Sequence, residues 1–159
     1  MSQRRQTALA IIDAYNNWDL PAILSFRDSN CIHQILPKSL NRPPLSNSDY
    51  ETYFTPWLKA FTNFHVTIND IFEDEKENKI VLWAQSTSDS VIGPYDNEYM
   101  LAFYFNEDGD KVVRMLEFVN STVSVDFFPR LRKYFEGEGA AEAVPVPKQE
   151  RKFGDGVIR

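Results

Sequence analysis

Apolar and polar residues alternate with a period of two along most of the second half of the chain. This alternation predicts four strands rich in aromatic and aliphatic residues, at 64–72, 79–88, 95–105 and 111–120. Polar turns at 73–78 and 106–110 separate them, and an interruption at 91–95 predicts a bulge or a wide turn. The residues before the first strand are mainly helical in pattern. Helices followed by an antiparallel meander are typical of the α+β class, in which a curved sheet carries helices on one face and encloses a cavity.

Helical periodicity dominates the first half of the chain. Residues 3–17 carry apolar side chains at helical spacing, and Asp19 can cap a second short helix. A turn is expected at 27–30 and a short strand at 31–36, which Pro37 stops.

A third helix is predicted at roughly 47–62. Ser46 or Ser48 can cap it, and the pair Ser48 and Glu51 fits a capping box. Pro56 falls near its middle, so it should kink the helix or split it into two.

The composition divides the chain into one domain and a tail. At 159 residues the chain is expected to form a single domain with a sizeable core. A final helix is predicted at 125–135, and the residues after it change to Gly, Ala and Glu followed by alternating Val and Pro. We therefore expect a domain at 1–135 and a flexible or partner-ordered tail at 136–159.

Charge and hydropathy exclude several classes of partner. The net charge of −6 argues against a nucleic-acid-binding surface, which needs a basic patch. No apolar run approaches the length of a membrane span, and the N-terminus lacks the apolar region of a signal peptide, so a cytoplasmic protein is expected. The single cysteine, Cys31, permits no intrachain disulfide and is better explained as a buried thiol than as a nucleophile.

The order of predicted elements resembles the cone-shaped fold of the NTF2-like superfamily, and within it the fungal SnoaL-like group. The resemblance covers about residues 5–135. It is carried by Cys31-Ile32-His33-Gln34-Ile35-Leu36-Pro37, Asn47…Tyr50…Tyr53-Phe54, Phe61-Thr62-Asn63-Phe64-His65-Val66, Ile92-Gly93-Pro94-Tyr95-Asp96-Asn97-Glu98-Tyr99, Glu117-Phe118-Val119-Asn120-Ser121 and Asp126-Phe127-Phe128-Pro129-Arg130-Leu131.

The resemblance implies a curved, mostly antiparallel sheet whose concave face is covered by the N-terminal helices. It also implies an acid/base pocket that needs no cofactor and no metal, in which members of the group rearrange enolisable ketones, esters or lactones of polyketide and meroterpenoid pathways. A second copy usually covers the outer face of such a sheet, so a homodimer is expected. The superfamily also contains pure binding proteins, so the fold alone does not fix the function.

His33 is the first candidate for acid/base chemistry. Histidine titrates near neutrality and can pass a proton in either direction. Strand alternation places His33 on one face with Cys31 and Ile35. The alternative is a core histidine whose ring is satisfied by a backbone carbonyl.

Glu98 and Glu117 are the candidate carboxylates. Each lies in a predicted strand among apolar residues, where a carboxylate is costly unless it is paired or protonated, and burial would make it a usable acid or base. Glu98 can instead sit exposed at the rim of the sheet, and either group can be a structural anchor. The alternation does not say which face of the sheet is concave.

Five further residues are predicted to contact a small aromatic or polycyclic apolar substrate through stacking, phenol donors or apolar surface: Tyr53, Trp57, Trp83, Tyr99 and Met115. Plain core packing is the alternative for each of them. Phosphate loops, nucleophile elbows and metal-ligand clusters are absent from the sequence, so nucleotide, covalent and metal mechanisms are disfavoured.

Three functions remain compatible with these residues. The first is a cofactor-independent isomerase or cyclase in secondary metabolism, in which one of His33, Glu98 and Glu117 removes a proton next to a carbonyl. The second is a binding module that holds an apolar ligand or a partner without turnover. The third is a hydrolase or dehydratase in which the same residues activate water.

Overall fold

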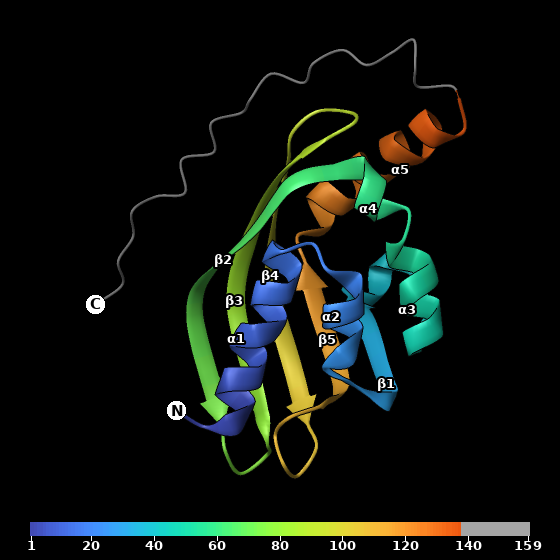
Figure 1. Cartoon of the computed structure of the whole chain (residues 1–159). Coiled ribbons are helices and arrows are strands. Elements are labelled where there is room, and N and C mark those ends of the chain that lie inside the picture. Colours follow the sequence, from blue (N-terminus) through green and yellow to red (C-terminus); the bar gives the residue numbers. More distant parts are fainter. Residues whose placement is uncertain (138–159) are drawn as a thin grey trace.

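The computed structural model describes residues 1–137, so the predicted tail at 136–159 lies outside the described residues apart from its first two. Helices and strands follow the expected order (Figure 1). They are α1 (Gln3–Asn16), α2 (Leu20–Ser25), β1 (Arg27–Leu36), the 3₁₀ helix η1 (Lys38–Leu40), α3 (Asn47–Phe54), α4 (Trp57–Ala60), β2 (Phe61–Asp74), β3 (Lys79–Ser90), β4 (Tyr95–Phe105), β5 (Val112–Val119) and α5 (Ser121–Phe135).

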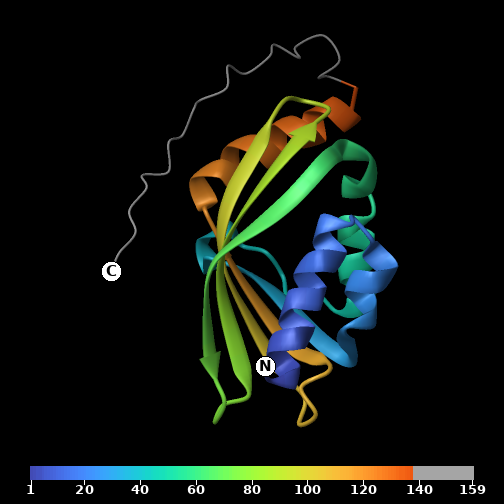
Figure 2. The same cartoon turned by 60° about the vertical axis from the view of Figure 1, so that its left-hand side comes forward.

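The five strands form one mixed sheet in the order β1-β5-β4-β3-β2. Strands β2 to β5 are an antiparallel meander, and β1 joins its edge parallel to β5. Figure 2 shows the sheet strongly twisted and curved, with α1 to α4 on one side of it. The predicted α+β architecture, with the N-terminal helices on the concave face of a mostly antiparallel sheet, is confirmed.

The main core lies between α1 and the half of the sheet that is lower in Figure 1. Ala8, Ile11 and Ile12 of α1 are buried against Ile80 and Leu82 of β3, which are fully buried. At the other end, aromatic side chains of the helices and the sheet form two further clusters. The fold therefore has a closed aliphatic end and an aromatic end.

Two local predictions about the third helix have different outcomes. The split at Pro56 is confirmed, because α3 ends at Phe54 and α4 begins at Trp57. The capping box joins Ser46 to Asp49, where each residue's side chain binds the other's backbone N–H. The alternative pairing of Ser48 with Glu51 is therefore wrong, and the helix begins two residues earlier than that pairing requires.

Two elements extend beyond their predicted limits, one through strand pairing and one through a local helix cap. The expected turn at 27–30 is the beginning of β1, since Arg27 pairs with Val112 of β5. The last helix begins at Ser121 rather than near residue 125, because the Asn120 side chain accepts a hydrogen bond from the backbone N–H of Thr122. Within residues 1–137, no helix has the length and apolar character that crossing a membrane requires.

Candidate active site

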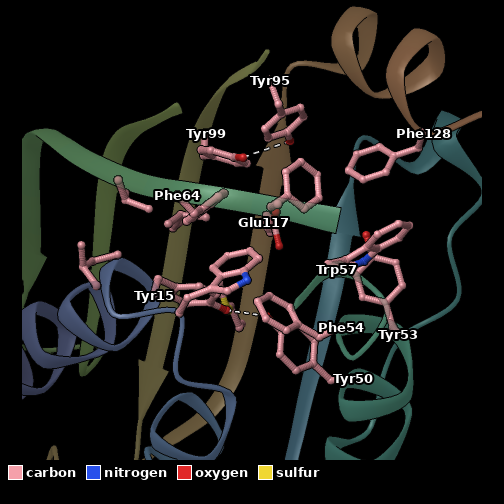
Figure 3. A pocket seen from close by; sticks show the side chains of 16 residues that line it. Tyr15, Tyr50, Tyr53, Phe54, Trp57, Phe64, Tyr95, Tyr99, Glu117 and Phe128 are labelled. Atoms are coloured by element: carbon pink, nitrogen blue, oxygen red, sulfur yellow. Dashed lines mark hydrogen bonds between the residues drawn. The ribbon is translucent and has the colours of Figure 1, made fainter. Parts of the chain in front are cut away.

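A cavity of about 100 Å³, partly open to solvent, lies between the concave face of the sheet and the helices. Eleven aromatic and four aliphatic side chains line it, and Glu117 is the one carboxylate among the described lining residues. Figure 3 shows Glu117 in the middle of this space, with Tyr53 and Trp57 on one side and Tyr15 and Tyr99 on the other. The cavity can hold a flat apolar molecule and offer it a single anionic group.

Strand register explains why Glu117 faces the cavity. Glu117 of β5 pairs with Leu101 of β4, and Met115 pairs with Phe103, so these side chains share the concave face. On its other side β5 pairs with β1, where His33 lies opposite Met115. This register brings the Nε2 atom of His33 to 2.8 Å from Oε2 of Glu117.

His33 supports Glu117 from behind the cavity wall. Its side chain is fully buried, with 0% exposed, whereas the Glu117 side chain retains 22% exposure. Nη1 of Arg27 lies 3.4 Å from Nδ1 of His33. A guanidinium can only donate, so Nδ1 accepts and Nε2–H donates to the carboxylate, which assigns the neutral Nε2–H tautomer from the hydrogen bonds.

Arg27 is itself fixed in place by two neighbours. Its Nε donates to Oδ1 of Asn47 at 2.8 Å, and its guanidinium carbon lies 4.3 Å from the centroid of the Tyr50 ring. The same Tyr50 ring stacks on His33 at a centroid distance of 4.9 Å. Arg27, His33 and Glu117 thus form a chain of charge and hydrogen bonds that holds the carboxylate in one orientation.

Phenol groups form the rest of the polar lining. The hydroxyls of Tyr15 and Tyr50 are 2.6 Å apart, and that of Tyr99 is 2.8 Å from Oγ of Ser86 and 3.2 Å from the Tyr95 hydroxyl. Burial raises the pKa of Tyr15 and of Tyr95 to about 12. Burial also raises the pKa values of the other cavity tyrosines, which are Tyr50, Tyr53 and Tyr99. These side chains are therefore neutral near pH 7 and can donate hydrogen bonds to a ligand.

The structure brings most of the predicted site residues to one place. Glu117, Tyr53, Trp57, Tyr99 and Met115 all line the cavity. The buried His33 reaches it only through Glu117, so the geometry makes it a positioning group rather than a residue that touches a ligand.

Glu98 and Trp83 lie on the opposite face of the sheet, so the expectation that they line the cavity is wrong. Trp83 is 40% exposed, and its indole N–H donates to Oε1 of Glu98 at 2.7 Å. The physical reason is strand alternation: Tyr99 faces the cavity, so its neighbour Glu98 must face away.

Sequence reasoning missed Arg27, Trp18, Tyr15 and Tyr50 as parts of this region. Arg27 stands in a polar run that has the composition of a turn, and nothing local marks its contact with His33. The other three occupy helical or turn positions typical of core residues. Among residues 1–137, no cluster of three or more His, Cys, Asp or Glu side chains can hold a metal ion.

Comparison with protein sequences places the chain among fungal biosynthetic proteins. No family model matches it. It is 33% identical to core atranone cluster protein 11 of Stachybotrys chlorohalonatus, over 83% of this chain and 98% of that protein. It is also 31% identical to monooxygenase AacuP of Aspergillus aculeatus, over 82% of this chain and 90% of that protein.

Comparison with solved structures gives the same picture. The BvnE pinacolase from Penicillium brevicompactum is similar with a TM-score of 0.78 and 28% identity, over 82% of this chain and 91% of that one. A SnoaL-like protein from Shewanella denitrificans shares the fold, with a TM-score of 0.64 at 9% identity over 79% of this chain and 96% of that one.

Proposed function

Because the chain belongs to the fungal SnoaL-like group of the NTF2-like superfamily, we propose that it is a cofactor-independent isomerase or cyclase. Its substrate would be a polyketide- or meroterpenoid-type intermediate of secondary metabolism. A pinacolase among the similar structures supports a rearrangement of the carbon skeleton as the class of reaction.

One observation carries the proposal: a single carboxylate, held by a buried histidine, in an aromatic cavity. Within residues 1–137, the Glu117 side chain lines the cavity, and its Oε2 atom accepts a hydrogen bond from Nε2–H of His33. No lysine or arginine of residues 1–137 forms an ion pair with Glu117. The carboxylate is thus oriented without being neutralised, which is what a general base requires.

The proposed reaction needs only proton transfer. Glu117 removes a proton from the carbon next to a carbonyl, and the electron pair moves onto the carbonyl oxygen to form an enolate. A donor group of the cavity stabilises the oxygen. Glu117 then returns the proton to another carbon. Alternatively, the enolate carbon closes a ring on a second carbonyl carbon of the same molecule, whose oxygen receives the electron pair and then the proton from Glu117. Atoms are conserved in both outcomes, so no redox partner is consumed.

Arg27 and His33 would assist this step from behind. The neutral His33 lies between Arg27 and Glu117, which do not form a direct ion pair. Its ring accepts a hydrogen bond from the Arg27 cation and donates one to the Glu117 carboxylate, so the cation acts on the carboxylate through the ring. When Glu117 takes up a proton, the hydrogen bond from Nε2–H still holds its other oxygen in place. The base therefore keeps its orientation between proton removal and proton return.

The test is incubation of the purified protein with a panel of enolisable polycyclic ketones and lactones, followed by chromatography and mass spectrometry. A new product of unchanged mass supports an isomerase or cyclase. A product heavier by one water indicates hydrolysis, and a product lighter by one water indicates dehydration. A product heavier by one oxygen atom indicates monooxygenase chemistry, the activity for which AacuP is named. Retention of a compound without any product supports a binding module. Each of the last four outcomes overturns the proposal.

A further inference from the structure

A second, smaller cavity of about 30 Å³ adjoins the aromatic cavity and shares part of its wall. The shared lining residues, all labelled in Figure 3, are Tyr53, Tyr95, Glu117 and Phe128. We call this space the side cavity. A single water needs about 10–15 Å³, so the side cavity has room for one or two polar atoms but not for a ring. A polar substituent of a ligand that fills the aromatic cavity can therefore enter it.

Arg42 is the one positively charged residue among the described residues that line the two cavities. Its side chain is half-buried and forms no hydrogen bond or ion pair within residues 1–137. The other polar groups of the side cavity have partners, since the Asn97 amide donates to the Tyr95 hydroxyl at 2.8 Å. The Ser124 hydroxyl donates to the carbonyl oxygen of Asn120 at 3.3 Å. Arg42 therefore supplies the free charged donors of this space.

The backbone around Arg42 is fixed against β1. His33 and Leu45 exchange two backbone hydrogen bonds, at 2.9 and 2.8 Å. The Gln34 side chain donates to the carbonyl oxygen of Arg42 at 3.1 Å. Because the ring of His33 also holds Glu117, two neighbouring residues of β1 position both charged groups of the side cavity.

The charges of Glu117 and Arg42 act on the same phenol. Burial and the Glu117 charge raise the pKa of Tyr53, and the positive charge of Arg42 opposes this rise. The two groups thus face one space, Glu117 from β5 and Arg42 from the loop after η1, yet they form no ion pair with each other. The side cavity between them can take an oxygen atom of a ligand.

Resting on the function proposed above, we propose that the side cavity binds the carbonyl oxygen of the substrate and that the Arg42 guanidinium donates hydrogen bonds to this oxygen. When Glu117 removes the proton, the electron pair of the C–H bond forms the C=C bond of the enolate, and the carbonyl π electrons move onto the oxygen. Glu117 becomes neutral and the negative charge lies beside Arg42, which keeps all its protons. A charged donor stabilises the enolate more strongly than the ketone, so Arg42 is a catalytic residue.

The test measures binding of two unreactive probes of nearly the same shape, 2-naphthoate and 2-naphthamide. The protein is the Glu117→Gln variant, because a neutral side chain beside an anionic ligand reproduces the charges that follow proton removal. We expect naphthoate to bind more tightly than naphthamide. Adding Arg42→Gln should reduce this preference roughly 10- to 100-fold, the effect of a lost hydrogen bond to a charged group. Adding Lys38→Gln instead removes an exposed cation of the same segment, and this matched control should leave the preference nearly unchanged.

A crystal structure of Glu117→Gln with 2-naphthoate gives a second measurement, which does not require an Arg42 variant to fold. We expect the rings in the aromatic cavity and the carboxylate beside the Arg42 guanidinium. No preference for naphthoate, an unchanged preference after Arg42→Gln, an equal loss after Lys38→Gln, or a carboxylate bound elsewhere would each overturn the inference. Neither probe can form an enolate, so these results are independent of the reaction, which the incubation test examines with the wild-type protein.

Discussion

The two faces of the sheet each carry a glutamate that accepts a hydrogen bond from an aromatic ring nitrogen. On the concave face, Glu117 accepts from a histidine that is fully buried and is itself backed by Arg27. On the convex face, Glu98 accepts from Trp83, which is 40% exposed. The pairs have similar lengths, at 2.8 and 2.7 Å, but different surroundings. A hydrogen bond to a carboxylate therefore does not identify a site by itself.

The surroundings decide what each carboxylate can do. Around Glu117, aromatic rings limit contact with water, although the side chain keeps 22% exposure, and the buried chain from Arg27 fixes its orientation. Its charge therefore acts on a ligand with less screening than at an open surface. Around Glu98, solvent screens the charge and provides competing hydrogen bonds. The comparison predicts chemistry at the concave face and, at most, association at the convex one.

The largest expected difference between the faces is in activity. With a substrate identified by the incubation test, Glu117→Gln should lower turnover by ~100- to 10,000-fold, because a positioned base is removed. Glu98→Gln makes the same chemical change on the convex face and should leave turnover nearly unchanged. Thermal unfolding checks that both variants are folded. Normal turnover in Glu117→Gln, or a comparable loss in Glu98→Gln, would refute the assignment.

His33 refines this prediction, because its proposed role is to orient Glu117. His33→Ala should reduce turnover less than Glu117→Gln does. His33→Gln, whose amide can donate to the carboxylate, should recover part of the loss. Equal losses in both His33 variants would contradict the positioning role.

The next largest difference is in stability, and two arginines provide a matched pair. Arg27 lies over Tyr50 in the buried chain, whereas the exposed Arg114 lies over Tyr104 on the convex face, 5.1 Å from its ring centroid. Arg27→Leu removes the hydrogen-bond donors to Nδ1 of His33 and Oδ1 of Asn47 and should lower the free energy of unfolding by about 2–4 kcal/mol. Arg114→Leu should cost less than about 1 kcal/mol. Urea denaturation measures both, and equal costs would remove the distinction between the faces.

The smallest expected effect concerns association through the convex face. Phe118, Met100 and Trp83 are between 40% and 51% exposed there, and we propose that a second copy of the chain covers them. Phe118→Ala should weaken the homodimer about 10-fold, the loss typical of an apolar contact residue. Light scattering over a concentration series measures the dissociation constant, with Asp13→Ala on α1 as the control. A wild-type mass of 18.4 kDa at micromolar concentration would exclude the dimer.

The sequence alone predicted the elements that depend on local patterns. Period-two alternation correctly placed the four strands of the meander, and helical spacing and Pro56 placed the helices and the break between α3 and α4. These signals are local because each follows from the geometry of a single strand or helix. The resemblance on residues such as His33 and Glu117 also led to the right group, although Arg27 and most of the residues that line the cavity were not among the predicted site residues.

The tertiary structure alone decided which side chains meet. Both faces of the long strands carry apolar residues, so alternation separated Glu98 from Tyr99 without showing which of them faces the cavity. That choice depends on which face of the sheet the helices cover, and the sequence of a single strand does not contain this information. The contact between His33 and Glu117 depends on the parallel pairing of β1 with β5, across 84 residues of chain. Such pairing arises from packing of the whole domain. The same packing brings Arg27, which lies in a polar run of the sequence, into contact with His33, and His33 in turn holds the candidate base Glu117.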